Sequence, residues 1–199
     1  ITAFKRFAEN GDLSACAARV VAYSDDPNLQ LSIRDSERRA VVRPTFCNKA
    51  VSFYHGQGNN FLIRRDLFLD VGGADERLGA GAPGRSGQDA ELNWRILDRG
   101  LSIGFEPDAK VVHYPRETRE SFLRKKRNYY YAGTWWIVAL HPFAPSCLFG
   151  LARRMADPPV AAAIAALSLD RRKLRQRWEE GKGFWGGLAG AVRFRAAGK

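Results

Sequence analysis

The fold of this chain is decided by a stretch that opens with Gly56-Gln-Gly-Asn-Asn-Phe-Leu-Ile-Arg-Arg65 and closes with Glu106-Pro-Asp-Ala-Lys-Val-Val-His113. Between these ends the sequence reads Val71-Gly-Gly-Ala-Asp-Glu76 and then Gly87-Gln-Asp-Ala-Glu-Leu92. Glycine permits positive φ and close approach of another group to the main chain, so the glycines indicate tight turns. The stretch therefore combines glycine turns, an acidic helix start and a histidine that follows two valines.

The pattern of apolar residues predicts several short elements within this stretch. Strands are predicted over 60–63, 101–105 and 109–114, and helices over 66–71 and 88–99. In the second helix Leu92 and Ile96 are four residues apart, and Gly100 follows as a terminating glycine. Between the two helices, residues 79–87 carry four glycines and a proline, which predicts a mobile surface loop.

On either side of this stretch the residue composition and the apolar pattern of the chain change. Residues 1–9 have helical spacing, 15–23 form an apolar segment typical of a buried strand, and 28–40 are polar and predict an exposed loop. Residues 41–42 and 52–54 are predicted as short extended pieces. A basic and aromatic helix is predicted over 117–140, followed by Ala-rich and Arg-rich helices over 143–199. We therefore expect a main domain over 1–140 and a helical extension over 141–199.

Composition bounds the class of protein. A chain of 199 residues fits one domain, or one domain with an appendage. The net charge of +11 indicates a polyanionic partner, either nucleic acid, an acidic membrane face or a phosphorylated substrate; a merely solvated basic surface is the alternative. Cys16, Cys47 and Cys147 lack metal-ligand spacing and are predicted to be buried thiols in a reducing compartment. The most apolar run, residues 160–169, is half the length that a membrane span needs, roughly 20 residues.

Asp89 is the first candidate for chemistry. It lies at a predicted helix start directly after the glycine-rich loop, where unpaired N–H groups and the helix dipole stabilise a negative charge. A carboxylate in that position suits a general base, although an ordinary acidic first turn has the same sequence. Asp89 and Glu91 point about 200° apart around a helix and do not chelate one ion. Glu91 is expected to pair with Arg95 on the surface.

Two further features leave alternatives open. His113 ends a predicted strand, where a histidine either ligates a divalent cation or is partly buried with ordinary partners. The segment 119–136 combines cations with Tyr129-Tyr-Tyr131 and Trp135-Trp136, as nucleic-acid surfaces do. Its rings fall on consecutive positions and cover more than one face, which favours a helix lying on protein or on lipid headgroups.

Together these residues resemble the C-terminal half of a family 2 glycosyltransferase of the GT-A fold. Gly58-Asn-Asn60 with Arg64-Arg65 is similar to the family's Gly-x-Asn strand, and Val71-Gly-Gly-Ala-Asp-Glu76 to its Gly-Gly-Phe-Asp-Glu turn. Gln88-Asp89, with Leu92 and Arg95, is similar to its Glu-Asp helix, and Gly100, Pro107 and Val112-His113 complete the series. The resemblance covers residues 1 to about 135. It implies an α/β fold, namely the C-terminal half of a GT-A mixed-sheet domain with an α-helical appendage.

The resemblance also implies roles for individual residues. Asp89 would be the catalytic base of an inverting transfer from a nucleotide-sugar donor to a glycan or lipid-linked acceptor. Gly58, Asn60, Gln88 and Glu91 would bind the acceptor or substrate, and His113 would assist a Mg²⁺ or Mn²⁺ ion that stabilises the diphosphate. Contacts of Arg124 and Arg127 with phosphates are suggested by their position alone.

The sequence departs from the family pattern in three places. Gln88 stands where a Glu is usual, and Ala74 stands where the turn carries an aromatic residue. No Asp-x-Asp, the family's metal-binding motif, occurs among the 199 residues. The chain also begins without a Met, so we expect it to be a fragment that keeps the acceptor side, with the main metal ligands and the donor-binding half upstream.

The function expected is therefore that of a metal-dependent, hexosyltransferase-like enzyme, or part of one, in polysaccharide or cell-envelope biosynthesis. Its expected location is cytoplasmic, with peripheral contact between the basic extension and anionic lipid at the inner face of the cell membrane. The alternative is a non-catalytic basic module that binds nucleic acid or an anionic membrane surface, with nucleic acid the less favoured partner.

Overall fold

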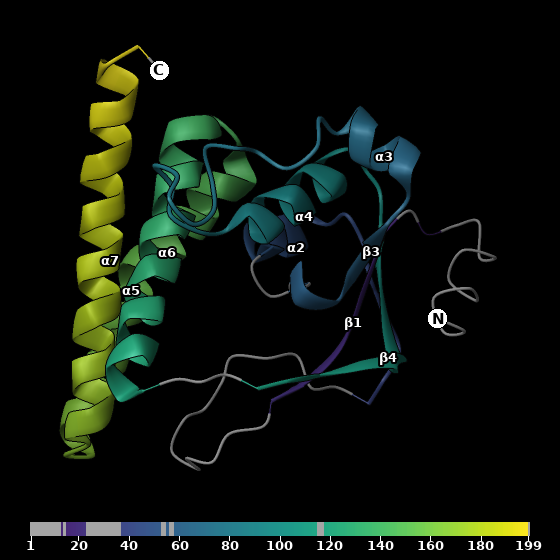
Figure 1. Cartoon of the computed structure of the whole chain (residues 1–199). Coiled ribbons are helices and arrows are strands. Elements are labelled where there is room, and N and C mark those ends of the chain that lie inside the picture. Colours follow the sequence, from purple (N-terminus) through teal and green to yellow (C-terminus); the bar gives the residue numbers. More distant parts are fainter. Residues whose placement is uncertain are drawn as a thin grey trace. The chain divides into compact units, whose positions relative to one another are not determined.

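The computed structural model describes residue 13 and residues 15–22, 37–52, 55, 58–114 and 118–198. The predicted helix over 1–9 and most of the predicted loop over 28–40 lie outside these residues. The described chain forms two compact units, one from residues 1–75 with 88–116 and the other from 76–87 with 117–199. Figure 1 labels most elements of both units.

The first unit contains a four-stranded mixed sheet in the order β2-β4-β1-β3. Its strands are β1 (Ala15–Ala22), β2 (Ala40–Val42), β3 (Phe61–Ile63) and β4 (Ile103–His113). β1 runs parallel to β4, while β2 and β3 are antiparallel to their neighbours. These strands confirm the predictions for 15–23, 41–42 and 60–63 to within a few residues. The α/β class is confirmed, whereas the GT-A arrangement stays a prediction.

The short helices of this unit are α2 (Phe46–Ala50), η2 (a 3₁₀ turn, Gly58–Asn60) and α3 (Arg65–Asp70). Thr45 caps α2, since its side chain accepts a hydrogen bond from the N–H of Asn48 at 3.2 Å. No helix was predicted here from the sequence, although Thr is a preferred N-cap residue and could have indicated one. The extended piece predicted over 52–54 is wrong at Ser52, which lies in a helical turn after α2, and residues 53 and 54 lie outside the described ones.

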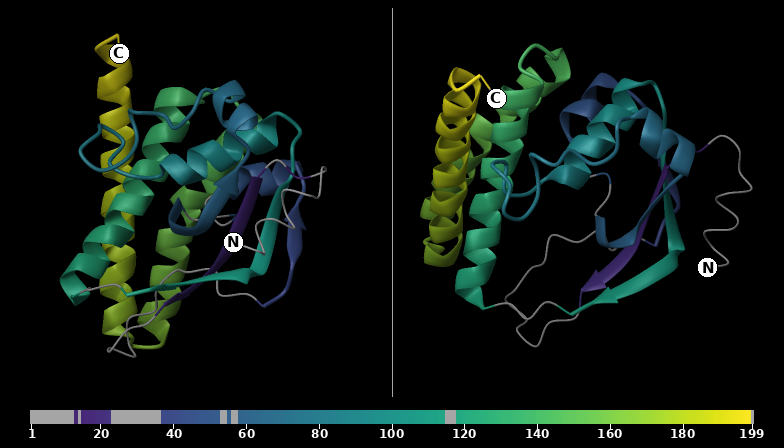
Figure 2. Two further views of the ribbon diagram at one scale, coloured as in Figure 1. Left: turned by 45° about the vertical axis from the view of Figure 1, so that its right-hand side comes forward. Right: turned by 45° about the horizontal axis from the view of Figure 1, so that its top comes forward.

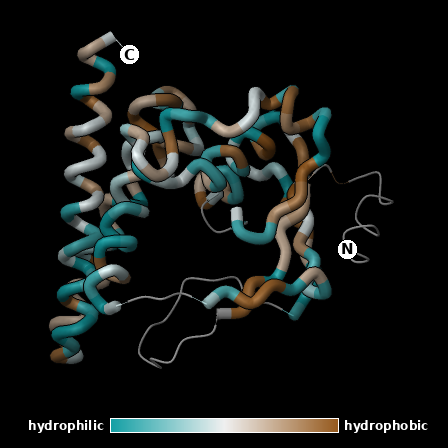
Figure 3. The backbone as a smooth tube through the Cα atoms, viewed as in Figure 1, coloured by the Kyte–Doolittle hydropathy of each residue, from teal (hydrophilic) through white to brown (hydrophobic). Residues whose placement is uncertain are grey.

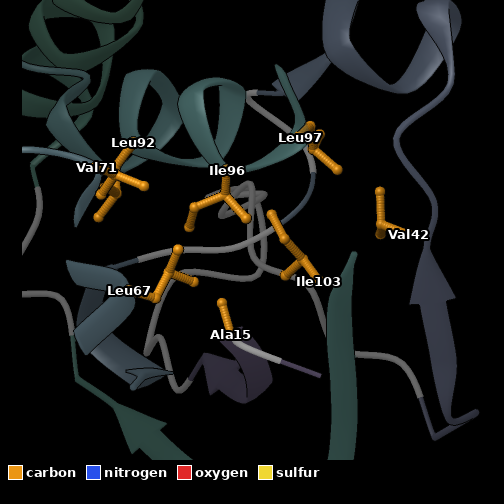
Figure 4. Packing of buried hydrophobic residues seen from close by; sticks show 8 residues of the cluster. All are labelled: Ala15, Val42, Leu67, Val71, Leu92, Ile96, Leu97 and Ile103. Carbon is orange, nitrogen blue, oxygen red and sulfur yellow. The ribbon is translucent and has the colours of Figure 1, made fainter. Parts of the chain in front are cut away.

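Helix α4 (Gln88–Asp98) packs its apolar side against the sheet, as Leu92, Ile96 and Leu97 predict. The core that they form is shown in Figure 4 and consists of eight buried residues: Ala15, Val42, Leu67, Val71, Leu92, Ile96, Leu97 and Ile103. In Figure 3 β1 and β3 are mostly hydrophobic, whereas β4 is hydrophilic around its bend. This core holds the first turn of α4 at a fixed place beside the 3₁₀ turn and β3.

The strand β4 is continuous from 103 to 113, where two separate strands over 101–105 and 109–114 were predicted. Between the two predicted strands, the pairing of β4 with β1 is irregular. Ala18 is opposite Glu106, but Val20 is opposite Val111, so β4 contains extra residues there. Proline lacks an N–H for the ladder, so it is tolerated at such a bulge. Asn60 closes the gap, because its Nδ2 donates to the carbonyls of Arg19 and Ala109 at 2.9 and 2.7 Å.

The second unit is built from three long helices, α5 (Arg119–Leu140), α6 (Pro145–Leu167) and α7 (Arg171–Ala196). They lie side by side in both views of Figure 2. Arg127 meets Gly183, Tyr131 meets Gly187 and Trp135 stacks edge-on with Phe194, so α5 and α7 run in the same direction. The predicted helices over 117–140 and 143–199 are confirmed.

The glycine-rich segment 76–87 is irregular, as predicted, but it is packed and not merely a surface loop. Leu78 and Gly84 are buried, and the guanidinium of Arg85 lies 4.0 Å from the ring centre of Tyr131. The compact helical unit includes α5, whereas the predicted domain boundary fell after α5, near 140. The functional division of the chain at that point stays a prediction. Across the described residues, no helix is both long and apolar enough to cross a bilayer.

Candidate functional site

Asp89 lies in the first turn of α4, where backbone N–H groups hold its carboxylate. Its Oδ2 accepts a hydrogen bond from the N–H of Gly58 at 3.2 Å, and its Oδ1 accepts one from the N–H of Ala90 at 2.9 Å. The Gly58 bond links α4 to a turn 31 residues earlier in the chain. The side chain is half-buried, so the carboxylate is oriented by the protein and still reaches solvent.

A hollow of about 190 Å³ opens beside this carboxylate. Residues from η2, β3, α3 and α4 line it: Gly58, Phe61, Ile63, Phe68, Ala74, Gln88, Asp89, Leu92 and Asn93. Most of this lining is apolar, and its polar side chains, Gln88, Asp89 and Asn93, all come from α4. Ala74 stands where the resembled family carries an aromatic residue, so its small side chain leaves this space open. The structure thus brings Gly58, Gln88 and Asp89 together around one hollow.

Glu91 lies in a different environment from the one that its spacing predicts. The side chain is 1% exposed and forms a two-pronged ion pair with Arg95, from Nε to Oε1 at 2.8 Å and from Nη2 to Oε2 at 2.8 Å. The predicted pair is present, but the prediction of a surface pair is wrong, because α4 buries this side against the protein. Glu91 does not line the hollow; its predicted role in acceptor binding stays untested.

Arg95 is the residue whose importance the sequence analysis missed. Beyond Glu91, its guanidinium donates to the carbonyl of Val71 and, at 2.7 Å, to that of Gly73. Gly72 and Gly73 have φ of +86° and +72°, a conformation that favours glycine. Arg95 therefore ties the glycine turn after α3 to the helix that carries Asp89. The signal in the sequence was a double glycine followed by an acidic-basic pair four residues apart.

Asn60 and His113 do not line the hollow. The amide nitrogen of Asn60 is engaged with the carbonyls of β1 and β4, which makes it a structural clamp beneath Gly58. His113 is the last residue of β4, half-buried and opposite Ala22. Within the described ranges, no three His, Cys, Asp or Glu side chains are grouped so that they hold a metal ion. The described residues therefore do not fit a complete Mg²⁺ or Mn²⁺ site, and the metal role of His113 stays a prediction.

The two candidate phosphate ligands belong to the second unit. Arg124 is exposed on α5, while Arg127 pairs with Glu179 of α7 at 3.3 Å. Arg127 thus serves in the packing of two helices, and contact with a phosphate would compete with that pair.

A carboxylate held at a helix start beside an open hollow, in a mixed α/β domain, is compatible with an enzyme that transfers sugars. Comparison with known proteins supports that class. The chain is similar to the pre-mycofactocin glycosyltransferases of two Mycobacterium tuberculosis strains, CDC 1551 / Oshkosh and ATCC 25618 / H37Rv. Each is 28% identical over 120 residues, which cover 57% of this chain and 23% of the relative. The chain thus spans about a quarter of the length of these relatives. The similarity supports a relationship between this chain and glycosyltransferases.

No family model matches the chain, and no solved structure matches it at a significant level. The relationship to a glycosyltransferase therefore rests on these curated relatives and on the composition of the site.

Proposed function

We propose that this chain carries the acceptor side of an inverting glycosyltransferase of the family 2, GT-A type. The donor would be a nucleotide-sugar and the acceptor a glycan or a lipid-linked sugar, as in the synthesis of cell-envelope polysaccharides. The observation that carries the proposal is the position of Asp89, fixed by the Gly58 N–H at the edge of an open hollow. The sequence relationship to a glycosyltransferase supports the class of reaction.

In this proposal Asp89 acts as the general base. Each oxygen accepts one backbone N–H, so each keeps a lone pair for the hydroxyl of an acceptor sugar. Asp89 takes the hydroxyl proton as the hydroxyl oxygen bonds to the anomeric carbon of the donor. The bond from that carbon to the diphosphate breaks on the opposite side, and the electron pair leaves with the nucleoside diphosphate. Attack opposite the leaving group inverts the anomeric configuration.

The surroundings of Asp89 suit this role. The backbone donors hold the carboxylate in place without neutralising it, and the apolar lining from Phe61, Phe68 and Leu92 offers a surface for the faces of a sugar ring. Gln88 precedes the base at the same rim and has an amide for contacts with further hydroxyl groups. Arg95 fixes the turn after α3, and thereby one wall of the hollow.

The experiment is substitution of Asp89→Asn in the complete gene product that contains this sequence. Release of nucleoside diphosphate from a panel of UDP- and GDP-sugars is measured with sugar acceptors present. We expect turnover to fall by about 10²–10⁴-fold, the usual contribution of a positioned base. The thermal midpoint is expected to fall by no more than about 2–4 °C, because Asn keeps one oxygen for the N–H of Gly58 and loses only one of the two accepted hydrogen bonds, worth about 1 kcal/mol.

Asp98→Asn is the matched control, since Asp98 is an exposed carboxylate at the other end of α4 that pairs with Lys49. Its turnover is expected to equal that of the parent. Turnover that survives Asp89→Asn at the level of the control would reject the assignment of the base.

A further inference from the structure

The net positive charge of this protein is concentrated in one part of the chain. Residues 117–199 carry sixteen Lys and Arg against six Asp and Glu, a net charge of +10 out of the total of +11. The first 116 residues are close to neutral. The helical unit is therefore the part of the protein that an anionic partner attracts.

Within this unit, the corner between α6 and α7, residues 160–175, exposes large apolar side chains. Leu167 and Leu169 are 88% and 85% exposed, and Val160 and Ile164 lead to them along one side of α6. Trp178 is exposed two turns into α7. Single exposed apolar residues are ordinary, but a run of them at the tip of a helical hairpin marks an interaction surface.

The backbone of Leu169 is held in an unfavourable conformation. Its φ is +54°, the left-handed region that a residue with a Cβ seldom occupies. It follows the helix cap at Ser168, where the N–H of Asp170 bonds to the carbonyl of Ala165 at 2.9 Å, an arrangement that normally selects glycine. A leucine here gains almost no burial within the fold. Its side chain is thus disfavoured by backbone and solvent alike, unless a partner covers it.

Cations lie next to this apolar tip in the chain and at the same end of the helical unit. Arg171, Arg172, Lys173 and Arg175 are exposed on the first turns of α7, immediately after Leu169. Helix α5 begins at the same end of the helical unit, away from the C-terminus of α7, and brings Arg119, Arg124 and Lys125 (Figure 1). Exposed leucines flanked by cations match a lipid surface, because its acyl chains accept apolar side chains and its phosphates attract positive charges.

We infer that the α6–α7 corner is a contact site for an anionic lipid bilayer. The aliphatic side chains of Leu167 and Leu169 enter the boundary between headgroups and acyl chains, while the cations beside them contact lipid phosphates. A nucleic acid would use the cations but leaves no role for two aliphatic side chains at the tip. This inference does not depend on the proposed sugar transfer.

The test measures binding of the chain to vesicles of phosphatidylcholine alone and of phosphatidylcholine mixed with phosphatidylglycerol, by flotation. Strong binding is expected only to the anionic vesicles. Leu169→Gly combined with Leu167→Ser is expected to weaken it on the order of tenfold, through loss of apolar insertion. Arg171→Gln with Arg175→Gln is expected to weaken it by more than tenfold, at roughly fivefold per cation near an anionic surface.

Val192→Ser with Arg193→Gln is the matched control, since both residues are exposed near the far end of α7. This variant is expected to bind the anionic vesicles as the parent does. Leu169→Gly alone is expected to keep or raise the thermal midpoint, because glycine relieves the positive φ, so that weaker binding is not a result of unfolding.

Two vesicle results, and one result with DNA, would overturn the inference. One is that the leucine variants bind the anionic vesicles as tightly as the parent, which would reduce the contact to bulk charge. The other is that corner and far-end variants lose binding equally. Binding of duplex DNA that is tighter than vesicle binding and shares its sensitivity to the leucines would also contradict a lipid site.

Discussion

At the scale of single residues, the site depends on backbone groups and on one guanidinium. Asp89 is oriented by the N–H of Gly58, a group that every residue type except proline provides, so no sequence pattern identifies this contact. Arg95 donates hydrogen bonds to Glu91, Val71 and Gly73, and its side chain is only 14% exposed. The geometry of the proposed acceptor hollow therefore depends on a residue that never touches the hollow.

Replacing Arg95 is predicted to be severely destabilising. Arg95→Ala leaves the Glu91 carboxylate buried without its partner, and breaking such a pair costs about 3–5 kcal/mol. Arg95→Lys is predicted to recover only part of this loss, because an ammonium cannot form the two-pronged bond and reach two carbonyls. Urea unfolding followed by circular dichroism measures the change in the free energy of unfolding.

Lys49→Ala is the control for this prediction. Lys49 also pairs with a residue of α4, Asp98, at 3.0 Å, but both side chains of this pair are partly exposed. Exposed pairs contribute about 0–1 kcal/mol. If Arg95→Ala costs no more than Lys49→Ala, the buried network does not hold the turn.

At the scale of elements, α5 and α7 approach closely along a row of glycines. A Cβ added at Gly183 would lie 2.2 Å from the carbonyl oxygen of Arg127, and one at Gly187 would lie 2.4 Å from that of Tyr131. These glycines are four apart, with Ala191 one turn further, so small residues line one side of α7. Backbone contact between the helices is possible only because this side lacks larger groups.

Gly187→Ala is therefore predicted to destabilise the helical unit. The new methyl group meets backbone atoms that cannot rotate away, and such overpacking costs about 1–3 kcal/mol. Gly181→Ala is the control in the same helix, because nothing lies within 4 Å of its added Cβ. There the better helix propensity of alanine is expected to stabilise by up to about 1 kcal/mol. Thermal unfolding distinguishes the two; equal effects would show that α5 and α7 do not pack in this way.

The start of α7 predicts a dependence of stability on pH. Asp170 caps the helix, accepting from the N–H groups of Arg172 and Lys173 at 3.0 and 2.9 Å. The bond from the backbone of Lys173 is the main cause that lowers the pKa of Asp170 below its usual 3.8. Because the pKa of Asp170 is lower in the folded state, its carboxylate stabilises the protein fully at pH values above 3.8. This contribution is lost as the pH falls through the pKa of the folded state.

Asp170→Ala is thus expected to lower the thermal midpoint at neutral pH, with a difference from the parent that shrinks as the solution is acidified below 3.8. Asp170→Asn keeps an oxygen acceptor and is expected to lie between the two, with little pH dependence of its own. A deficit of Asp170→Ala that grows on acidification would contradict this sign.

At the scale of the whole molecule, the accessibility of the three cysteines can be used to follow unfolding of both units. Cys16 in β1 and Cys147 in α6 are buried, whereas Cys47 is exposed, so the prediction of three buried thiols is wrong at Cys47. Burial, with a further contribution from Glu106, raises the pKa of the Cys16 thiol from 9.0 to about 11. Since the thiolate is the reactive form, Cys16 remains inert at mildly alkaline pH.

Alkylation with iodoacetamide is predicted to label Cys47 first and to spare Cys16 and Cys147 in the native protein. As urea is added, labelling of Cys16 reports opening of the sheet unit and labelling of Cys147 reports opening of the helical unit. Peptide mapping by mass spectrometry follows each site. Rapid native labelling of Cys16 would contradict its burial.

The elements of this fold were largely predictable, and the contacts between distant segments were not. Leu92 and Ile96 four apart, and the alternation at 101–105, identified a helix and a strand because local periodicity carries that information. The continuous β4 was missed because proline usually ends a strand, and the clamp that permits it, Asn60, lies 49 residues from its partner Ala109. The burial of Glu91 was missed because spacing places a pair on a helix but does not tell which side faces the core.

The sheet of the first unit is bordered, among its described strands, by β2 and β3, each only three residues long. A strand of that length offers a foreign chain few backbone rungs, and short edges are one way in which proteins avoid fibril-like association. Arg39 and Arg64 flank these two edges, where they pair with Glu106 and Asp66, and charged side chains of this kind beside an edge further disfavour pairing with a foreign strand. Concentrated solutions of this protein should therefore resist amyloid growth from the native sheet.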